Sequence, residues 1–395
     1  MDPIKNPFSP NAGAPPPALV GRDALLQTFQ IALERIRIGR SQKSMFPTGL
    51  RGVGKTVLLN KFVDKARSLG YVVAQLEASE SQTFVETLAA EARSALYELS
   101  ASAKMSASIS KALKILKSFS LTLDMSDFSA RLGVDAQVGT GDSGILSSDL
   151  TALFIALGEA ARNEQVAVLF AIDELQYLSE EQLSAIIVAV HRITQLSLPL
   201  LVVGTGLPQL AALAGNAKSY AERLFDYPTI GALTRDDAFE AIRMPLRDQG
   251  VDIEVPALAR LYEITEGYPY FIQEWAYAVW DSAAASPITL NDVNRAEPEV
   301  LAKLDQSFFR VRYDRLTPRE KRYLRAMAEL GAGPHRSGDV AAILEVKVES
   351  LSPLRNGLIK KGMIYSPQHG DTAFSVPLFD SFMRRSIASL WEHER

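Results

Sequence analysis

One short motif constrains the fold of this chain more than any other feature. The pattern GxxxxGK[ST] is matched in full by Gly49, Leu50, Arg51, Gly52, Val53, Gly54, Lys55 and Thr56. Residues 44–46 before it favour a short strand, and the pattern from Val57 to Ser68 favours a helix. Strand, glycine-rich loop and helix in this order are the setting in which the motif forms a P-loop. A plain glycine turn before a helix is the alternative, and the two flanking elements argue against it.

A P-loop binds phosphates mainly through its backbone. Its glycines let N–H groups curl around the β- and γ-phosphates of a nucleotide, and the ammonium group of Lys55 reaches the phosphate oxygens. The hydroxyl of Thr56 is a ligand for Mg²⁺ at a helix N-terminus, where the helix dipole favours anions. We therefore expect ATP and Mg²⁺ as cofactors, bound by residues 49–56.

A second motif supplies two carboxylates. The apolar strand predicted over Val166–Ile172 ends in Asp173 and Glu174. Asp173 is expected to hold the magnesium ion through water, and Glu174 to polarise the attacking water as general base. Such a pair at a strand end often only caps the next turn. With a P-loop upstream in the same chain, the catalytic interpretation is favoured.

The remaining pattern predicts an α/β domain of the P-loop NTPase type. Strands are predicted over residues 71–76 and 200–203, and helices over residues 22–36, 82–99, 148–163 and 180–195. This alternation predicts a parallel sheet sandwiched by helices, with ligand chemistry at the carboxyl ends of the strands. Residues 100–146 interrupt it, and we treat them as an insertion. A short helix is predicted there over Lys111–Lys117, followed by a hairpin of Phe119–Leu123 with Arg131–Val138.

Composition excludes several other classes of protein. The chain has 395 residues, which is enough for about two or three domains. The absence of cysteine excludes disulfides, thiolate metal sites and cysteine nucleophiles, and four scattered histidines offer no zinc cluster. The N-terminus lacks an apolar signal segment, and no apolar run reaches the ~20 residues of a membrane span. We expect a cytoplasmic protein without membrane contact.

The order of elements predicts four parts. Residues 1–18, rich in Pro, Gly and Asn, are expected to run extended as a strap, and residues 19–233 to form the P-loop domain. Residues 234–313 carry only helical patterns, which predict a second, smaller domain. Residues 314–395 read as helix, helix, helix and hairpin, the order of a winged helix. Leu316-Thr317-Pro318 begins this last part with an N-cap and a proline at the first helical position.

At this point the chain resembles the AAA+ and related signal-transduction NTPases, which have an extra catalytic strand beside the P-loop strand. Within them it is most similar to the archaeal-type and origin-recognition ATPase group. Leu19-Val20-Gly21-Arg22 resembles the family segment whose backbone packs on adenine, which implies that Val20 and Gly21 contact the base and that residues 6–18 strap over it. Thr205 matches the first sensor, which reads the γ-phosphate. Gly267-Tyr268-Pro269 looks like the GxP element of the helical lid, which implies that Pro269 lies near the nucleotide.

The resemblance also implies a site that acts between subunits. Residues 219–225 resemble the family box with an arginine finger, so Arg223 is expected on the γ-phosphate of a neighbouring copy. A surface arginine paired with Glu222 or Asp226 is an equal alternative. No arginine beside Gly267 can act as second sensor, which favours a slow switch over a motor. Pro47 lies at the end of a predicted central strand, where it removes one backbone hydrogen-bond donor from the sheet. The sequence offers no functional explanation for it.

The C-terminal part is the only basic region of a chain with net charge -4. Val340–Leu344 and Ser352–Lys361 are predicted as the second and third helices of a helix-turn-helix, with Ser352 as N-cap and Pro353 in the first turn. Leu354 and Leu358 are expected to face inward. The residues expected to remain outside, available to double-stranded DNA, are Arg355, Lys360 and Lys361. Segments 363–366 and 373–376 are predicted to form the wing.

Two functions remain open on this evidence. In the first, a slow ATPase switch uses its nucleotide state to control how the winged helix grips DNA. In the second, the same switch is a signalling ATPase whose winged helix contacts a protein partner. Self-association is compatible with both. Transfer of phosphate to a small molecule is a weaker hypothesis, because the sequence shows no sign of a substrate pocket beyond the P-loop.

Overall fold

The computed structural model describes residues 1–11, 13–79, 84–101, 106–123, 125–130, 132–137, 139–368 and 370–387. These residues form two compact units that alternate along the chain. The sheet unit comprises Asp23–Thr48 and Leu58–Thr229, and the C-terminal unit comprises Met1–Arg22, Gly49–Val57 and Ile230–Arg395. Each unit is described by itself. The predicted boundaries at residues 18, 233 and 313 stay predictions.

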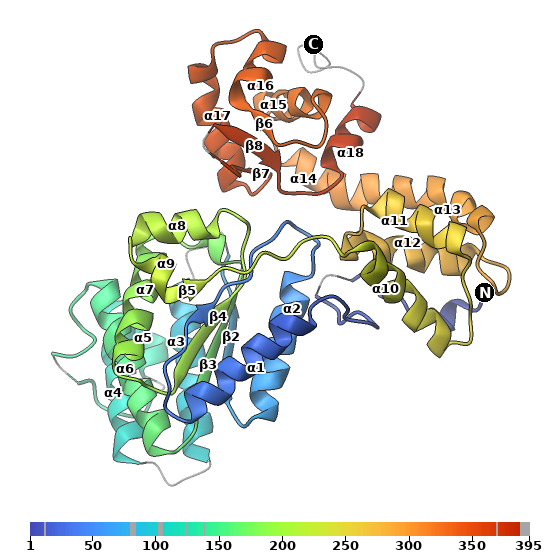
Figure 1. Cartoon of the computed structure of the whole chain (residues 1–395). Helices are drawn as coiled ribbons and strands as arrows, with labels where there is room; N and C mark the ends of the chain where they lie inside the picture. Colours follow the sequence, from blue (N-terminus) through green and yellow to red (C-terminus); the bar gives the residue numbers. More distant parts are fainter. Residues whose placement is uncertain are drawn as a thin grey trace. The chain divides into compact units, whose positions relative to one another are not determined.

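In the part of the chain that the structure describes, five parallel strands form the sheet of the sheet unit, and Figure 1 shows how they are arranged. They are β1 (Ser44–Met45), β2 (Val72–Glu77), β3 (Val168–Asp173), β4 (Leu200–Gly204) and β5 (Phe225–Asp226). Strands β2, β3 and β4 pair in that order, and β1 pairs with β5. Thr48 bridges Gly206 on one side and Thr229 on the other, which joins the two sets. The order β2-β3-β4-β1-β5 therefore places β4 between the P-loop strand and β3, as the resemblance implied.

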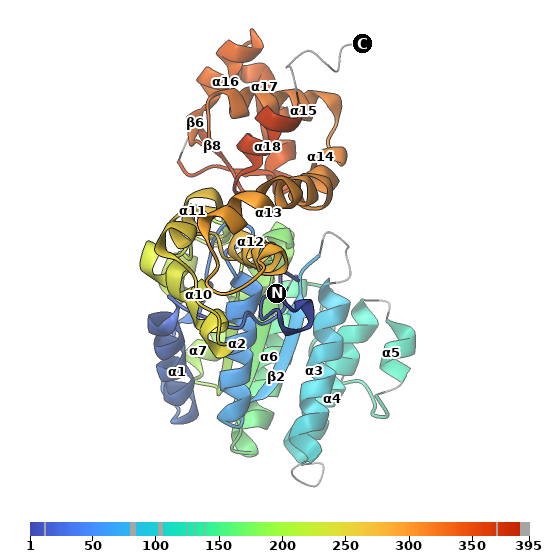
Figure 2. The same ribbon diagram turned by 90° about the vertical axis from the view of Figure 1, so that its right-hand side faces the viewer.

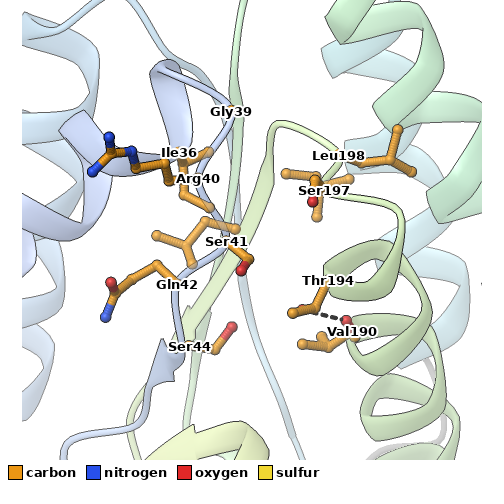
Figure 3. A pocket seen from close by; sticks show the side chains of 12 residues that line it. Ile36, Gly39, Arg40, Ser41, Gln42, Ser44, Val190, Thr194, Ser197 and Leu198 are labelled. Carbon is orange, nitrogen blue, oxygen red and sulfur yellow. Dashed lines mark hydrogen bonds between the residues drawn. The ribbon is translucent and has the colours of Figure 1, made fainter.

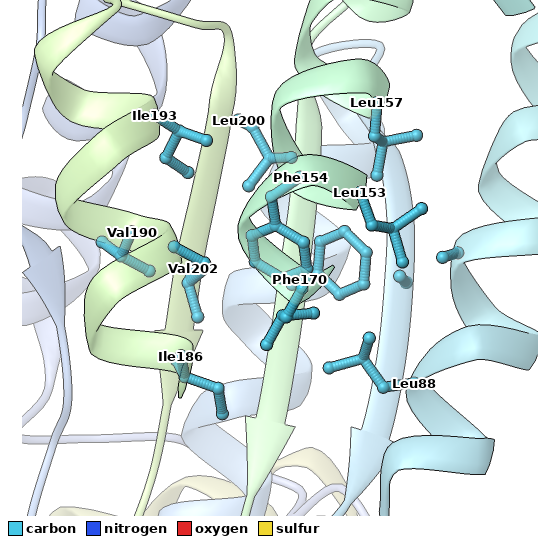
Figure 4. Close-up of a cluster of buried hydrophobic side chains, with 14 of the residues drawn as sticks. Leu88, Leu153, Phe154, Leu157, Phe170, Ile186, Val190, Ile193, Leu200 and Val202 are labelled. Carbon is cyan, nitrogen blue, oxygen red and sulfur yellow. The ribbon is translucent and has the colours of Figure 1, made fainter. Parts of the chain in front are cut away.

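Apolar side chains from the strands and from one layer of helices fill the core of the sheet unit. Helices α3 (Phe84–Ala101), α6 (Leu146–Asn163) and α7 (Glu180–Gln195) supply most of the helical side. Figure 4 shows Phe154 of α6 against Phe170 of β3, with ring centroids 5.0 Å apart. Strand β3 is buried at all six positions, the pattern of a strand covered on both faces. On the other side, α1 (Asp23–Arg37) meets α2 (Lys55–Ser68) through stacked Phe29 and Phe62.

The hairpin predicted in the insertion is wrong. Phe119–Thr122 ends a helix, α4 (Ala107–Thr122), which begins at the N-cap Ser106 and is followed by α5 (Ser126–Ala130). Ile109, Leu113, Leu116 and Phe119 recur at helical spacing and are fully buried, so this period overrides the short alternation around Phe119. The described part of the second predicted strand, residues 132–137, contains no strand. Arg131 and Val138, like Gln82 at the predicted start of α3, lie outside the described residues.

Pro47 fits the sheet because its neighbours along β1 make the bonds to β5. The backbone N–H groups of Phe46 and Thr48 donate to Asp226 and Pro228, at 2.7 and 2.9 Å. Pro47 faces the other way, where its carbonyl accepts from Gly206 at 3.2 Å. The donor that proline lacks is thus lost only on the β4 side, at the last turn before the P-loop.

The C-terminal unit begins with a helical region after residue 230. Its helices are α10 (Arg235–Asp248), α11 (Val255–Thr265), α12 (Pro269–Ser282), α13 (Leu290–Lys303), the π-helix η3 (Leu304–Phe309) and α14 (Arg310–Asp314). Residues 290–314 therefore do not form one continuous α-helix. Two short helices, α8 (Leu210–Ala217) and α9 (Ala221–Leu224), precede β5 in the sheet unit.

The predicted winged-helix order is present after residue 316. It consists of α15 (Pro318–Glu329), β6 (His335–Arg336), α16 (Ser337–Leu344), α17 (Val348–Lys360), β7 (Ile364–Tyr365), β8 (Asp371–Phe374) and α18 (Phe379–Ser386). The three strands form an antiparallel sheet in the order β6-β8-β7. Thr317 caps α15 in a capping box with Glu320, as its sequence predicted.

The predicted start of the third helix is wrong. Helix α17 begins at Val348, one turn before the predicted N-cap Ser352, and Pro353 lies inside it. Buried Leu351 belongs to the inward face together with Leu358, which extends the helix toward its N-terminus. Proline is tolerated here because the one backbone bond it removes would end on Glu349, whose carbonyl lies in the exposed first turn.

The N-terminal residues also depart from the expected irregular strap. Pro3–Lys5 form a 3₁₀ turn capped by Asp2, and Phe8 is buried in the core of the C-terminal unit. The side chain of Asn6 donates to the carbonyl of Tyr277 on α12 at 3.0 Å. Residues 1–8 thus lie along α12. Separately, none of the described helices is long and apolar enough to cross a membrane.

Candidate nucleotide-binding site

The P-loop has the backbone that its glycines predict. Gly52 and Gly54 have φ values of +79° and +88°, which L side chains rarely adopt, and a Cβ added at Gly49 would collide with the carbonyl of Ile230. Space around Gly54 is open on the side where a Cβ would stand. Helix α2 begins at Lys55, so the N-terminus of a long helix follows the loop directly. This backbone fits a phosphate group.

Lys55 lies within the curl of the loop. Its side chain is only 6% exposed, and Nζ donates to the carbonyls of Gly49 at 3.1 Å and Leu50 at 2.9 Å. A buried ammonium group held by neutral carbonyls can exchange them for phosphate oxygens, which carry formal charge and make stronger bonds. The position of Lys55 therefore fits the predicted cation of the site.

The helical region contacts the P-loop through the start of α12. The backbone N–H of Tyr270 donates to the carbonyl of Gly52 at 3.1 Å, and a Cβ on Gly52 would stand 3.1 Å from Cβ of Tyr270. Tyr270 directly follows Pro269, the proline of the predicted GxP element and the first residue of α12. Gly267 has φ +72° and accepts from the N–H of Leu233 at 2.8 Å, so this element ties α12 to the chain before α10.

The winged helix contacts the P-loop as well. The backbone N–H of Arg51 donates to the carbonyl of Ser375 at 3.0 Å, and its Nε donates to the carbonyl of Gly362 at 3.4 Å. Gly362 and Ser375 lie at the two ends of the wing hairpin and are themselves bonded through the hydroxyl of Ser375. Arg51 thus joins the loop to the base of the wing.

The segment predicted to contact adenine lies in the same unit as the P-loop. Gly21 has φ +70°, and a Cβ there would stand 2.8 Å from the carboxylate of Asp237 on α10. Val20 is partly buried against the core of the C-terminal unit. Arg22 donates to the carbonyl of Gly231 at 2.6 Å and, at 3.5 Å, to Val53 of the P-loop. Burial lowers the pKa of Arg22, and the carboxylate of Asp237 partly opposes this.

The carboxylates of the sheet unit lie where the second motif predicts. Asp173 is the last residue of β3 and is 7% exposed. Its Oδ1 accepts from the hydroxyl of Thr205 and, at 2.9 Å, from the N–H of Glu174. Thr205 is fully buried after β4, and its backbone bonds to Ile172 and Leu175 hold it beside β3. The predicted sensor and the predicted metal ligand are therefore in direct contact.

Glu174 has an unusual backbone for a residue with a long side chain. Its φ of +57° lies in the left-handed region, where non-glycine residues are uncommon. Its carboxylate accepts from Nε2 of Gln176, whose Oε1 accepts in turn from the N–H of Leu207 at 3.0 Å. The half-buried carboxylate is thus held by Gln176 at the carboxyl edge of the sheet.

Glu77 is a third carboxylate at this edge. It ends β2 directly opposite Asp173 in the register of the two strands. Burial raises the pKa of Glu77, and the nearby carboxylates of Asp173 and Glu174 raise it further. Among the described residues, no group of three or more His, Asp or Glu side chains is arranged to hold a metal ion.

Arg223 lies on α9 with its side chain exposed. Among the described residues it has no ion-pair partner, whereas Asp226 pairs with Lys43 at 3.4 Å. The pairing with Asp226 that would have made Arg223 a plain surface residue is therefore not formed, and its role in a neighbouring copy stays a prediction.

The three basic residues predicted to bind DNA differ in their surroundings. Arg355 is half-buried, against the expectation that it stays outside, and donates to Thr372 Oγ1, Ser366 Oγ and the carbonyl of Asp371 at 2.7 to 2.9 Å. Its guanidinium group thus ties α17 to the wing. Lys361 donates to the buried carboxylate of Glu320 at 2.7 Å. Of the three, Lys360 is exposed without a bond to another described residue.

Cavities occur at both edges of the sheet. One of about 580 Å³ is lined by Ser79, Phe119, Tyr177 and Glu181 among others, between the insertion and the carboxyl edge. At the amino edge, a small hollow lies between the loop after α1 and the end of α7, and Figure 3 shows Ser41 and Ser44 on one side of it and Val190 and Thr194 on the other. No described residue of the two predicted motifs lines either cavity.

Some residues at these sites carried no usable signal in the sequence. Gln176, Tyr270 and Ser375 act through backbone and side-chain bonds that no motif marks. The sequence pattern indicates a role for the backbone of residues 19–22 but none for the side chain of Arg22. Glu77 could have been found, because it is a carboxylate directly after an apolar predicted strand, the same signal that identified Asp173.

Two family models match parts of the chain. Residues 18–203 match one described as an AAA ATPase domain, and residues 306–383 match one described as a domain of unknown function. Comparison with curated protein sequences found no match.

Several solved structures are similar in fold. The Walker-type ATPase of Pyrococcus abyssi aligns at 16% identity with a TM-score of 0.59, over 93% of this chain and 96% of that chain. The Orc1 protein of Aeropyrum pernix, solved in complex with DNA, aligns at 14% identity with a TM-score of 0.49, over 97% and 96%. The RuvB Holliday junction branch migration motor of Thermotoga maritima aligns at 15% identity with a TM-score of 0.43, over 89% and 92%.

The strand order, the glycine-rich loop before α2 and the carboxylates after β3 define an α/β P-loop fold, followed by a helical region and a small antiparallel sheet of winged-helix type. Residues 18–203 are an AAA ATPase domain.

Proposed function

We propose that this protein is a slow ATP-binding and ATP-hydrolysing switch in which the nucleotide bound at residues 49–56 controls the winged helix. The bond from the N–H of Arg51 to the carbonyl of Ser375 carries this proposal. Arg51 is part of the loop that binds phosphate, and Ser375 is part of the wing. A change in the curl of the loop on nucleotide binding must therefore stretch or shorten a bond to the winged helix.

The proposed chemistry uses both motifs on one nucleotide. Lys55 and the N–H groups at the start of α2 bind the phosphates, and Val20, Gly21 and Pro269 lie around the base. Thr56 and Asp173 would hold Mg²⁺, which would neutralise charge on the phosphates. Glu174 takes a proton from the attacking water, and Thr205 keeps Asp173 in place. The AAA ATPase domain, which includes both motifs, supports this assignment.

The surface of α17 favours a protein partner for the winged helix over DNA. Arg355 and Lys361 are engaged by bonds within the C-terminal unit. The exposed residues of α17 are Glu349, Ser350, Ser352, Pro353, Asn356 and Lys360, together with 43% exposed Val348. This face has one acidic and one basic residue, whereas a helix that enters a DNA groove needs clustered Lys and Arg. The DNA-controlling switch is the second candidate, supported by the winged-helix order alone.

Hydrogen exchange of the whole protein tests the switch. We expect amides of α17 and α18 to exchange at different rates with ATP and without nucleotide. Lys55→Ala should abolish both ATP binding and this difference, because it removes the cation inside the loop. Equal exchange of the wild type in both states would contradict the switch, and undiminished ATP affinity of Lys55→Ala would contradict the assignment of the P-loop.

Binding of a fluorescent duplex separates the two candidate partners. A protein-binding winged helix predicts no salt-dependent affinity for duplex DNA at low salt, with or without ATP. If affinity is found, Lys360→Ala should weaken it and reduce the salt slope by about one unit per lost phosphate contact. Such a result would restore the DNA-controlling switch.

A further inference from the structure

A π-helix joins the helical region to the winged helix. η3 (Leu304–Phe309) follows α13 and leads directly into α14. In Figures 1 and 2 the chain passes here from α13 through α14 to α15. π-helices are rare, and within longer helices they occur frequently at functional sites. Two adjacent aromatic residues, Phe308 and Phe309, end this turn. Both pack against Phe271 of α12, and each has a further aromatic partner that the other lacks.

Phe308 supports the residue that contacts the P-loop. Its ring stacks on the ring of Tyr270, with centroids 4.7 Å apart and planes at 25°. The hydroxyl of Tyr270 donates to Glu274 at 3.0 Å, and Lys303 donates to the same carboxylate at 3.0 Å. Tyr270 is therefore fixed at its ring and at its hydroxyl. Its backbone N–H donates to the carbonyl of Gly52, so Phe308 packs on the residue that makes this bond to the P-loop.

Phe309 and Asp305 contact the last helix of the winged helix. The Phe309 ring is buried and stacks on Phe382 of α18, with centroids 5.1 Å apart and planes at 18°. Asp305 accepts from Nε of Arg385, also on α18, at 2.9 Å. A single turn thus packs on the P-loop contact through one residue and on α18 through the next.

We infer that η3 transmits the nucleotide state of the P-loop to the winged helix, with Phe308 as a positioning residue for the Tyr270–Gly52 bond; this rests on the switch proposed above. Coupling between sites requires packed elements that have two discrete arrangements. A π turn can return to α geometry by releasing one residue, which rotates the following helix by about 100°. Phe308 and Phe309 are adjacent, so such a change moves the contact with Tyr270 and the contact with α18 together.

The test compares Phe308→Leu with Phe308→Tyr in the whole protein. Leucine removes the ring that stacks on Tyr270 and keeps an apolar side chain, whereas tyrosine keeps the ring. We expect Phe308→Leu to bind ATP within a few-fold of the wild-type affinity, yet to lose most of the nucleotide-dependent difference in hydrogen exchange of α17 and α18. Phe308→Tyr should retain that difference. Thermal unfolding of each variant shows whether it is folded.

A second variant interrupts the same route from the other side. Asp305→Asn weakens the ion pair with Arg385 and does not change Tyr270. It therefore still tests the role of η3 if Phe308→Leu does not fold. We expect the same loss of response with ATP affinity unchanged. A wild-type response in both folded variants would overturn the role of η3 and leave the switch intact. Absence of any nucleotide response in the wild type would overturn the switch, and the role of η3 with it.

Discussion

At the scale of single residues, Glu174 combines an uncommon backbone with a fixed side chain. A left-handed φ at a glutamate costs of order 1 kcal/mol and persists only where surrounding contacts impose it. Here those contacts are the bond from its N–H to Asp173 and the bond from Gln176 to its carboxylate. Both hold the carboxylate in place at the carboxyl edge of the sheet, as a general base requires.

Glu174→Gln should bind ATP but fail to hydrolyse it. The amide keeps the shape of the side chain and leaves Asp173 unchanged, whereas it cannot accept the proton of the attacking water. We expect turnover to fall by about 10²- to 10⁴-fold while ATP affinity stays within a few-fold. Single-turnover hydrolysis and retention of ATP after gel filtration measure the two effects. Glu180→Gln, an exposed change in the first turn of α7, is the matched control. Loss of ATP binding in Glu174→Gln would make Glu174 structural instead.

Residues within local motifs were predictable from the sequence, and residues that act through tertiary contacts were not. Lys55 and Asp173 follow from a loop and from a strand end, each encoded by adjacent residues. The roles of Arg51 and Tyr270 depend on Ser375 and Gly52, which the fold brings to them from distant parts of the chain. The prediction that Arg355 remains outside is wrong, because its hydrogen-bond acceptors belong to the wing and not to its own helix.

At the scale of elements, periodicity predicted long helices and failed where one local pattern covered another. Helix α7 has the bounds that the sequence predicted. The alternation around Phe119 hid the end of α4, and Pro353 suggested a helix start that tertiary packing of Leu351 moves to Val348. Periodicity does not reveal the π-helix in residues 304–309, because a single wide turn is shorter than the stretch over which an apolar period can be recognised.

Arg355→Ala should destabilise the winged helix. It removes one guanidinium group that serves three acceptors on the wing, and leaves the partly buried hydroxyl of Ser366 and carbonyl of Asp371 without that donor. Loss of such a charged donor costs about 1 to 3 kcal/mol in the free energy of unfolding. Lys360→Ala, an exposed change on the same helix, should stay within about 0.5 kcal/mol. Denaturant unfolding measures both. Equal stability of the two variants would return Arg355 to the set of residues available to a partner.

At the scale of the whole molecule, the C-terminal unit provides a structural reason why the proposed switch would be slow. The P-loop is bonded to α12 through Gly52 and to the wing through Arg51. A movement of the P-loop on nucleotide binding therefore also disturbs its bonds to α12 and to the wing. The free energy of each of these bonds adds to the cost of that movement. In the sequence, only the absence of an arginine beside Gly267 favours a switch. The bonds from the P-loop to α12 and to the wing add a physical route by which such a switch could act.

Self-association decides whether hydrolysis is completed within one copy or between copies. If exposed Arg223 reaches the γ-phosphate of a neighbouring copy, ATP turnover per subunit should rise with protein concentration, because a finger in trans contributes up to about 10³-fold or more once assembled. Arg223→Ala should flatten that rise without weakening ATP affinity. Arg67→Ala, which removes another exposed arginine of the sheet unit, should leave the rise unchanged and so excludes a general effect of surface charge. A rate per subunit that is independent of concentration in the wild type would instead show that each copy hydrolyses ATP alone, and Arg223 would then be an ordinary surface residue.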